Sequence, residues 1–372
     1  MRIAHRRFWF CAFSVICISL ALAAGLTFGT RVFAASPAAT TSGANPSCQS
    51  IYVTNLALAT GQPANSKVYG ELCRPLHGPG HTVQVLVPGL IYNHVYWDWP
   101  NIPGHSNWSS TYSAVRYFTG YDTPASMGYT TFAIDRIGTG QSTRPASTDV
   151  NLATSTYVLH EIVQRLKTGT SIGGTKFAKV IVIGHSFGSL TSLTEAATYH
   201  DVDGVVLTSS LHKQNPNAAT IAQTMPAQDD PSLANVPAGY LTQAPGGIQA
   251  AFFYDPGTYS DPAVINYNEQ IKDTMTLGEL QDIGSATTST LSRQINVPVL
   301  EVVGQNDLLF CVDAIDCSSN ATVYKEEAPF FSAQAKLQVQ VIPNTGHDLN
   351  LHYSAPKTYA AIMAWSLAHV AP

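Results

Sequence analysis

The sequence predicts an α/β protein whose mostly parallel central sheet is flanked by helices. Two observations carry this prediction. Short apolar runs rich in β-branched residues recur along the chain, and helix-compatible segments separate most of them. Continuously apolar strands are typical of a parallel sheet buried on both faces, and the intervening helices supply its crossovers. The length of 372 residues, with 45% hydrophobic and 12% charged residues, allows one large domain.

The individual elements follow from these runs. The predicted strands cover residues 50–57, 67–73, 82–87, 129–134, 179–183, 203–208, 297–303 and 338–342. The predicted helices cover residues 108–118, 154–168, 187–199 and 353–369. The first two strands lie close together in the sequence, so we expect them to form an antiparallel edge.

The interval between the strands at 203–208 and 297–303 interrupts this alternation. It is rich in Pro, Gln, Ala, Tyr and Phe and lacks a strong strand signal. A simple crossover is much shorter. We therefore expect a helical cap over 211–290, inserted into a core formed by residues 50–210 and 291–372; a long, poorly packed excursion is the alternative.

The N-terminal residues have the pattern of a secretory signal. Arg2, Arg6 and Arg7 precede an uncharged stretch from Phe8 to Thr30, and Val32-Phe33-Ala34 resembles a cleavage site. We expect a signal peptide over 1–35, a flexible linker over 36–49 and a secreted, extracellular protein. The alternative is an uncleaved membrane anchor, because the uncharged stretch is long enough to span a bilayer.

The charges and cysteines that remain after cleavage restrict the function further. Four of the 19 Lys and Arg residues lie in 1–35, whereas all 24 Asp and Glu residues lie after it. The mature chain would therefore carry an excess of negative charge. No basic patch remains, which argues against a nucleic-acid partner. The four cysteines predict two disulfides, most simply Cys48–Cys73 and Cys311–Cys317. Their spacing matches no zinc pattern, so we expect no metal site.

The segment VIVIGHSFGSL, residues 180–190, places Ser186 between two glycines where a strand ends and a helix begins. A serine hydroxyl needs a base to become nucleophilic, and a sharp strand-to-helix turn projects it toward a substrate. Glycines two residues before and after leave room for that turn. The pattern therefore predicts Ser186 as a catalytic nucleophile; an idle serine in a glycine-rich turn is the alternative.

The partners of such a serine follow it in the order acid, then histidine. Asp307 comes just after the strand at 297–303, and His347 follows the strand at 338–342. We predict that His347 is the base and that Asp307 orients it. Asp307 as a simple turn cap is the alternative interpretation. His352 is the main competitor for the base. Asp313 and Asp316 are weaker candidates for the acid, because they lie within the expected Cys311–Cys317 loop.

An oxyanion that develops on the substrate requires two backbone N–H groups. We expect one from Phe187, the residue after the nucleophile. The other is expected from Leu90, which follows Pro88-Gly89 in the loop after the strand at 82–87.

These motifs resemble those of the α/β-hydrolase superfamily, in its esterase- and lipase-like branch, over about residues 50–370. The resemblance rests on Gly184-His185-Ser186-Phe187-Gly188, on Asp307 and His347 in that order, and on the run DRIGTGQS at 135–142. It implies the same three catalytic residues. Many relatives carry His-Gly where this chain has Pro88-Gly89, and the interval from Asp307 to His347 is longer than usual.

Aromatic residues suggest the substrate class. Tyr92, Tyr96 and Trp97 follow the predicted oxyanion loop, and the cap contributes Phe253. We predict that these four contact a neutral, fairly apolar ester. The alternative is that the rings only pack the core.

The sequence therefore predicts a secreted serine hydrolase that acts on small-molecule esters without a cofactor. The same triad also serves amide or lactone cleavage, acyl transfer, and cofactor-free lyase or peroxidase chemistry. A non-catalytic binding protein on this scaffold is a third hypothesis. We expect no stable membrane partner after signal cleavage, and the oligomeric state stays open.

Overall fold

The structure, a computed structural model, describes residues 46–372 except 79, 124–127, 171, 222, 288 and 313. The predicted signal peptide, 1–35, and most of the predicted linker lie outside the described residues. The linker was expected to reach residue 49, but strand β1 already begins at Ser47. Within the described part of the chain, no helix is long and apolar enough to cross a membrane.

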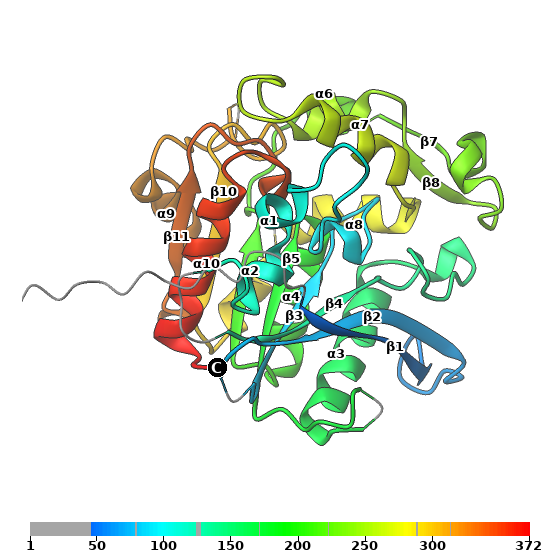
Figure 1. Cartoon of the computed structure of the whole chain (residues 1–372), viewed down its shortest axis with the longest axis vertical. Coiled ribbons are helices and arrows are strands. Elements are labelled where there is room, and N and C mark those ends of the chain that lie inside the picture. Colours follow the sequence, from blue (N-terminus) through cyan, green and yellow to red (C-terminus); the bar gives the residue numbers. More distant parts are fainter. Residues whose placement is uncertain are drawn as a thin grey trace, which may run out of the picture. The chain divides into compact units, whose positions relative to one another are not determined.

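An eight-stranded sheet with the order β1-β2-β4-β3-β5-β6-β10-β11 forms the centre of the described chain (Figure 1). Strands β1 and β2 pair antiparallel, as does β2 with β4, and all other neighbours are parallel. The predicted fold class is confirmed. Its strands are β1 (Ser47–Leu56), β2 (Ser66–Arg74), β3 (Thr82–Val87), β4 (Thr130–Ile134), β5 (Lys179–His185), β6 (Gly204–Thr208), β10 (Val299–Gly304) and β11 (Gln338–Ile342).

Helices lie on both faces of this sheet, as the continuously apolar strands require. They are α1 (Trp108–Tyr112), α2 (Ala114–Phe118), α3 (Leu152–Thr168), α4 (Phe187–Tyr199), α9 (Asn320–Glu327) and α10 (Ala355–His369). Helices α3 and α4 pack together and against β5, while α10 packs with α1 and α2. The buried apolar residues accordingly form two clusters. Val83 and Val85 of β3 belong to the cluster with α3, and Leu86 belongs to the cluster with α10.

The segment between β6 and β10 folds into short helices and a small second sheet. Its helices are α5 (Ala218–Ile221), α6 (Gly247–Phe252), α7 (Pro262–Ile271) and α8 (Leu277–Thr287). Three strands, β7 (Thr224–Pro226), β8 (Tyr240–Gln243) and β9 (Met275–Thr276), pair antiparallel. The sequence predicted helices alone here, because strands of two to four residues are too short to give a periodic signal. In Figure 1, α6, α7, β7 and β8 lie together at the top of the view.

The predicted helix over 108–118 is divided at Ser113, whose backbone is extended. Ser113 Oγ accepts a hydrogen bond from Arg116 N and donates one to Asp98 Oδ1, so the serine caps a new helix instead of continuing the old one. Helix α9 was not predicted. It begins with a capping box between Ser319 and Thr322.

Candidate active site

Ser186 lies at the sharp turn between β5 and α4, where the sequence places it. Its φ of 53° and ψ of −118° are rare for a residue with a side chain. The turn is held from β6, because Ser186 N donates a hydrogen bond to Thr208 O at 2.8 Å. Strain of this kind persists only where the surroundings impose it.

The two flanking glycines are required by close backbone contacts. A Cβ atom on Gly184 would lie 2.3 Å from Gly188 O, and one on Gly188 would lie 2.2 Å from Val87 O. Both separations are far below van der Waals contact, and both involve main-chain atoms that cannot turn away. The glycines therefore let the start of α4 approach β3 and β5 closely enough to form the turn.

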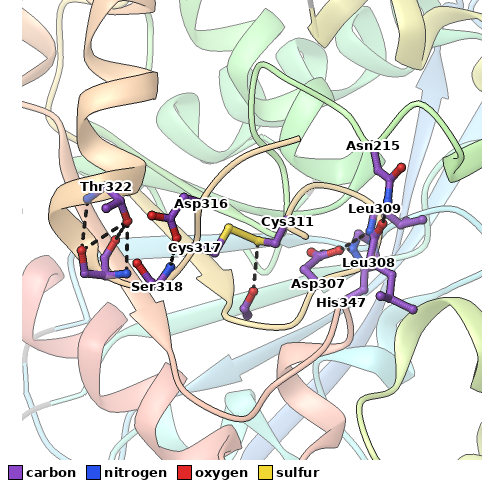
Figure 2. The surroundings of a disulfide bond; sticks show 12 residues. Asn215, Asp307, Leu308, Leu309, Cys311, Asp316, Cys317, Ser318, Thr322 and His347 are labelled. Atoms are coloured by element: carbon purple, nitrogen blue, oxygen red, sulfur yellow. Dashed lines mark hydrogen bonds and ion pairs between the residues drawn. A yellow bond between two sulfur atoms is a disulfide. The ribbon is translucent and has the colours of Figure 1, made fainter. Parts of the chain in front are cut away.

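Asp307 and His347 meet at the carboxyl ends of β10 and β11. Asp307 Oδ2 lies 2.9 Å from His347 Nδ1, and both side chains are buried. The other carboxylate oxygen of Asp307 accepts a hydrogen bond from Leu309 N at 2.9 Å. Figure 2 shows the Asp307 carboxylate directed at His347 from a short loop.

A disulfide and an asparagine fix the loop that carries Asp307. Cys311 is bonded to Cys317, and Cys48 is bonded to Cys73; these are the two pairs that sequence spacing predicts. Cys311 N donates to Asp307 O at 2.8 Å. On the other side of the loop, Asn215 Nδ2 donates to Leu308 O at 2.8 Å (Figure 2). The Asp307 side chain is thus held in position through the main chain of its loop.

The surroundings of His347 favour its protonated form. Burial alone would lower the pKa of His347, but the charge of Asp307, its hydrogen bond and the charge of Asp348 outweigh burial and raise it above the ordinary value of 6.5. The hydrogen bond from Nδ1 to Asp307 directs Nε2 away from the acid.

Ser186 and His347 line the same cavity, which has a volume of about 470 Å³. Most of its wall is apolar and comes from the loop after β3, from the segment 211–290 and from Leu309. The apolar lining residues include Leu90, Ile91, Phe252, Met275, Leu280 and Leu309. Besides Ser186 and His347, the polar lining residues include three amides, Gln214, Gln243 and Gln281, and the hydroxyl residues Tyr92 and Thr224. Apart from His347, the described residues of this lining include no basic side chain.

The model of the alpha/beta hydrolase family matches residues 84–362. The chain belongs to this family. A thermophilic esterase from Thermogutta terrifontis, solved with malate bound, aligns with 87% of this chain and 100% of its own, at 16% identity and a TM-score of 0.54. DcsB, solved with a substrate analogue, aligns with 88% of this chain and 100% of its own, at 14% identity and a TM-score of 0.55. At these identities the likeness shows the fold. No curated protein matches the chain.

In this α/β hydrolase, the loop after β3 passes directly over the serine. A Cβ atom on Gly89 would lie 3.1 Å from Ser186 Cβ. Arg136 donates from Nε and Nη2 to Gly89 O at 3.3 and 3.2 Å. The N–H and C=O of a trans peptide point in opposite directions, so this contact turns the N–H of Leu90 away from Arg136. The guanidinium also lies 5.0 Å from the centre of the Phe187 ring.

Residues 273–279 fix the same loop from the other side. Ile91 has a φ of 59°, which is a rare outlier for a β-branched residue. Its N–H donates to Thr274 O at 3.3 Å, and its carbonyl accepts from Asp273 N at 2.7 Å. Glu279 of α8 forms a buried ion pair with Arg136. Gly89 and Ile91, which flank the predicted oxyanion residue Leu90, are therefore both held by hydrogen bonds.

The four aromatic residues predicted to contact substrate divide into two groups. Tyr92 lines the cavity. Tyr96, Trp97 and Phe253 are not among the lining residues, which corrects the prediction. Tyr96 stacks on His185 at 4.3 Å, Trp97 is fully buried, and Phe253 stacks on His352 at 5.2 Å. These three rings pack in the core, where they bury a large apolar area. Phe252, the neighbour of Phe253, lines the cavity instead.

Asp348, which the sequence analysis did not single out, lies beside the site. Its Oδ2 accepts a hydrogen bond from Tyr92 Oη at 2.6 Å, and Asn268 Nδ2 donates to the same Tyr92 Oη at 2.9 Å. Burial raises the pKa of Asp348 to about 6, although the neighbouring His347 and the hydrogen bond from Tyr92 lower it. No local motif marks Asp348 or Asn268, because their partners are distant in the sequence.

His352, the alternative candidate for the base, forms hydrogen bonds with main-chain groups. Its Nε2 accepts hydrogen bonds from Tyr254 N at 3.0 Å and Gly346 N at 3.1 Å, and its Nδ1 lies 2.7 Å from Asp348 O. Both ring nitrogens are thus occupied. Burial lowers the pKa of His352, in agreement with the two N–H groups that donate to its Nε2. The second histidine supports the loop that presents His347.

No group of three potential metal ligands among the described residues includes a cavity residue. The groups that exist lie elsewhere, and the one that contains Cys48 and Cys73 is already used by their disulfide.

The Arg136–Glu279 pair gives a stability prediction. Glu279→Gln leaves a guanidinium buried without its counter-charge, which we expect to lower the free energy of unfolding by about 3 kcal/mol. The double variant Arg136→Met/Glu279→Leu removes both charges and should recover most of that loss. Urea unfolding measures both effects.

Glu269→Gln is the control, because Glu269 is 28% exposed and shares the buried Lys272 with Asp230 at 3.2 Å, so the lysine keeps a counter-charge when Glu269 is neutralised. We expect this variant to lose less than about 1 kcal/mol. Equal losses in Glu279→Gln and Glu269→Gln would contradict the account of the buried pair.

Proposed function

We propose that this α/β hydrolase is a serine hydrolase that cleaves carboxylic esters of neutral, fairly apolar substrates. One observation carries the proposal. A strained Ser186 and a His347 bonded to buried Asp307 line a single, mostly apolar cavity. Each group answers a requirement of acyl transfer: an activated nucleophile, a base and a group that orients the base.

The reaction proceeds in two steps. His347 Nε2 takes the proton of Ser186 Oγ while the oxygen attacks the ester carbonyl, and the same imidazolium then protonates the departing alcohol. Water, activated by His347, attacks the acyl-enzyme and releases the acid. Asp307 keeps the proton on Nδ1 and stabilises the imidazolium that forms in each step.

The oxyanion is assigned to the backbone N–H groups of Leu90 and Phe187. Phe187 N opens α4, so the positive end of the helix dipole acts at the same place. Two contacts support the role of Leu90: the hydrogen bonds from Arg136 to Gly89 O and the close approach of Gly89 to Ser186. A preorganised donor is more effective than one that must reorient during the reaction.

The cavity wall supports the substrate class. Leu90, Phe252, Met275 and Leu309 offer apolar contact, while the described lining residues include no Lys or Arg that would neutralise an anionic substrate. The three glutamine amides offer hydrogen bonds to neutral oxygen atoms.

Secretion forms part of the proposal. Disulfides persist in oxidising compartments, and the structure contains Cys48–Cys73 and Cys311–Cys317. Together with the predicted signal peptide, they support an extracellular location for the mature chain.

The first prediction concerns the nucleophile. Ser186→Ala removes the only atom that forms the acyl bond, so kcat on p-nitrophenyl esters should fall by at least about 10⁴-fold. The measurement is the initial rate across acyl chains from acetyl to palmitoyl, in which the optimum separates an esterase from a lipase.

Ser110→Ala is the control, since Ser110 is exposed, its Oγ donates to Asn107 O, and it does not line the cavity. Unchanged turnover in Ser186→Ala would refute the assignment. A wild-type protein inactive on every ester, but active on amides or lactones, would keep the triad and overturn the ester class.

A second prediction concerns pH. Only neutral His347 can act as base, so kcat/KM should fall as the pH drops through the pKa of His347, with a midpoint above 6.5. Asp307→Asn removes the charge that raises this pKa. The acidic limb should then move to lower pH, with a much lower plateau.

The control for the pH profile is Asp316→Asn, which removes an exposed carboxylate from the disulfide loop. Its acidic limb should coincide with that of the wild type. An acidic limb that stays in place in Asp307→Asn would show that another group titrates.

A further inference from the structure

A second cluster of ionisable side chains lies between α3 and α4. His160 comes from α3, Glu195 from α4, and Asp201 from the turn after α4. One ligand atom from each residue lies within 4.8 Å of the others. Glu195 follows Ser186 by nine residues on α4, which corresponds to roughly 13 Å of helix rise. The cluster is therefore separate from the cavity.

Several polar atoms of this cluster receive no hydrogen bond from a donor group. Glu195 is 0% exposed, and no N–H or O–H group of the described residues donates to its carboxylate oxygens, whose polar neighbour is the Asp201 carboxyl group. The same holds for Asp201 Oδ1 and for His160 Nδ1. His160 Nδ1 does lie 2.8 Å from Asp201 Oδ2 and 3.8 Å from Glu195 Oε1, but neither contact has the direction of a hydrogen bond. Leaving such atoms buried and unpaired is costly.

The local charges also favour a cation. Glu195 is fully buried, and a carboxylate oxygen of Asp201 lies within 4.8 Å of one of its own, so the two negative charges repel each other when both groups are ionised. The ammonium of Lys167 lies 3.4 Å from Asp203 and is paired there. Two carboxyl groups thus face each other and a histidine, an arrangement that a bound cation would stabilise.

The donor set has the chemistry of a zinc site. Zn²⁺ binds imidazole nitrogen and carboxylate oxygen at about 2.0–2.2 Å, which sets neighbouring ligand atoms roughly 3.4 Å apart in a tetrahedral arrangement. The two separations from His160 Nδ1 bracket this value. The side chains of His160 and Asp201 are 22% and 14% exposed, so an ion and a fourth ligand, water, can reach the site.

Two further contacts hold the ligands in place. Gln164 Nε2 donates to Asp201 Oδ2 at 2.5 Å, and the His160 ring stacks on Tyr199 at 3.7 Å. Contacts that orient the ligands in this way commonly accompany metal sites.

We propose that His160, Glu195 and Asp201 bind a divalent transition metal ion, with Zn²⁺ as the best fit, at a site separate from Ser186. The ion would join α3 to α4, the helix that begins at the nucleophile. The cysteine spacing, from which no metal site is expected, carries no information on these three residues. His160 and Asp201 are 41 residues apart, and no motif links them.

The comparable cluster of His212, Glu301 and Glu327 is a poorer candidate. His212 Nδ1 lies 2.5 Å from Glu327 Oε2, and its Nε2 lies 2.9 Å from Ser292 Oγ. Both ring nitrogens are engaged, and all three side chains are buried, so an ion would need to displace existing hydrogen bonds.

The test uses the mature full-length protein, treated with EDTA and dialysed. Isothermal titration with Zn²⁺ should show one ion bound per chain. At a hundredfold excess over Kd, Tm should rise by about 4 °C. Glu195→Gln should weaken binding at least tenfold, and His160→Gln, at a partly exposed position, should do the same. Co²⁺ in place of Zn²⁺ should give the visible absorption of a tetrahedral nitrogen and oxygen site.

Glu161→Gln is the matched control, because it removes the same charge from the neighbouring position on α3, where Glu161 pairs with Arg165 at 3.4 Å. It should bind Zn²⁺ as the wild type does. If Glu195→Gln does not fold, His160→Gln decides the question. Absence of saturable binding by the wild type would overturn the proposal, as would wild-type affinity in folded His160→Gln.

Discussion

The backbone of Ser186 adopts a conformation that residues with a side chain seldom take, and much of the site follows from how that conformation is maintained. Gly184 and Gly188 let α4 approach β3 and β5 through contacts that a single methyl group would prevent. Thr208 of β6 holds the serine amide. The turn therefore depends on three neighbouring strands at once, and its strain is balanced by the packing of the whole sheet centre rather than by a local bond.

The remaining groups reach the serine from distant parts of the chain. The loop at Asp307 is held by a disulfide and by Asn215, while the loop at His347 is supported by His352. Arg136 connects Gly89 with Glu279 of α8, so the segment inserted between β6 and β10 also supports the loop over the serine. That segment supplies cavity wall and anchors the same loop, which explains why the cavity and the predicted oxyanion site lie together.

The strands of the main sheet could be predicted to within three residues at each end, because continuous apolar runs rich in β-branched residues, such as TVQVLV, favour buried strands. Ser186, Asp307 and His347 could be singled out because each follows a strand end in a fixed order. The small β7-β8-β9 sheet could not be predicted, since its strands are too short for a periodic signal. Asp348, Arg136 and Glu279 could not be placed either, because their contacts join residues that are far apart in the sequence. Among the aromatic residues, composition alone could not separate Tyr92 from Tyr96 or Phe252 from Phe253.

The most direct test of the account is covalent labelling with an alkyl fluorophosphonate, followed by tandem mass spectrometry. Attack by the activated serine forms an oxygen–phosphorus bond and expels fluoride, so the label should appear on Ser186 at neutral pH. Labelling should be absent in folded Ser186→Ala, and slow in Asp307→Asn. A label on another serine, or no label on the folded wild-type protein, would contradict the assignment of Ser186 as an activated nucleophile.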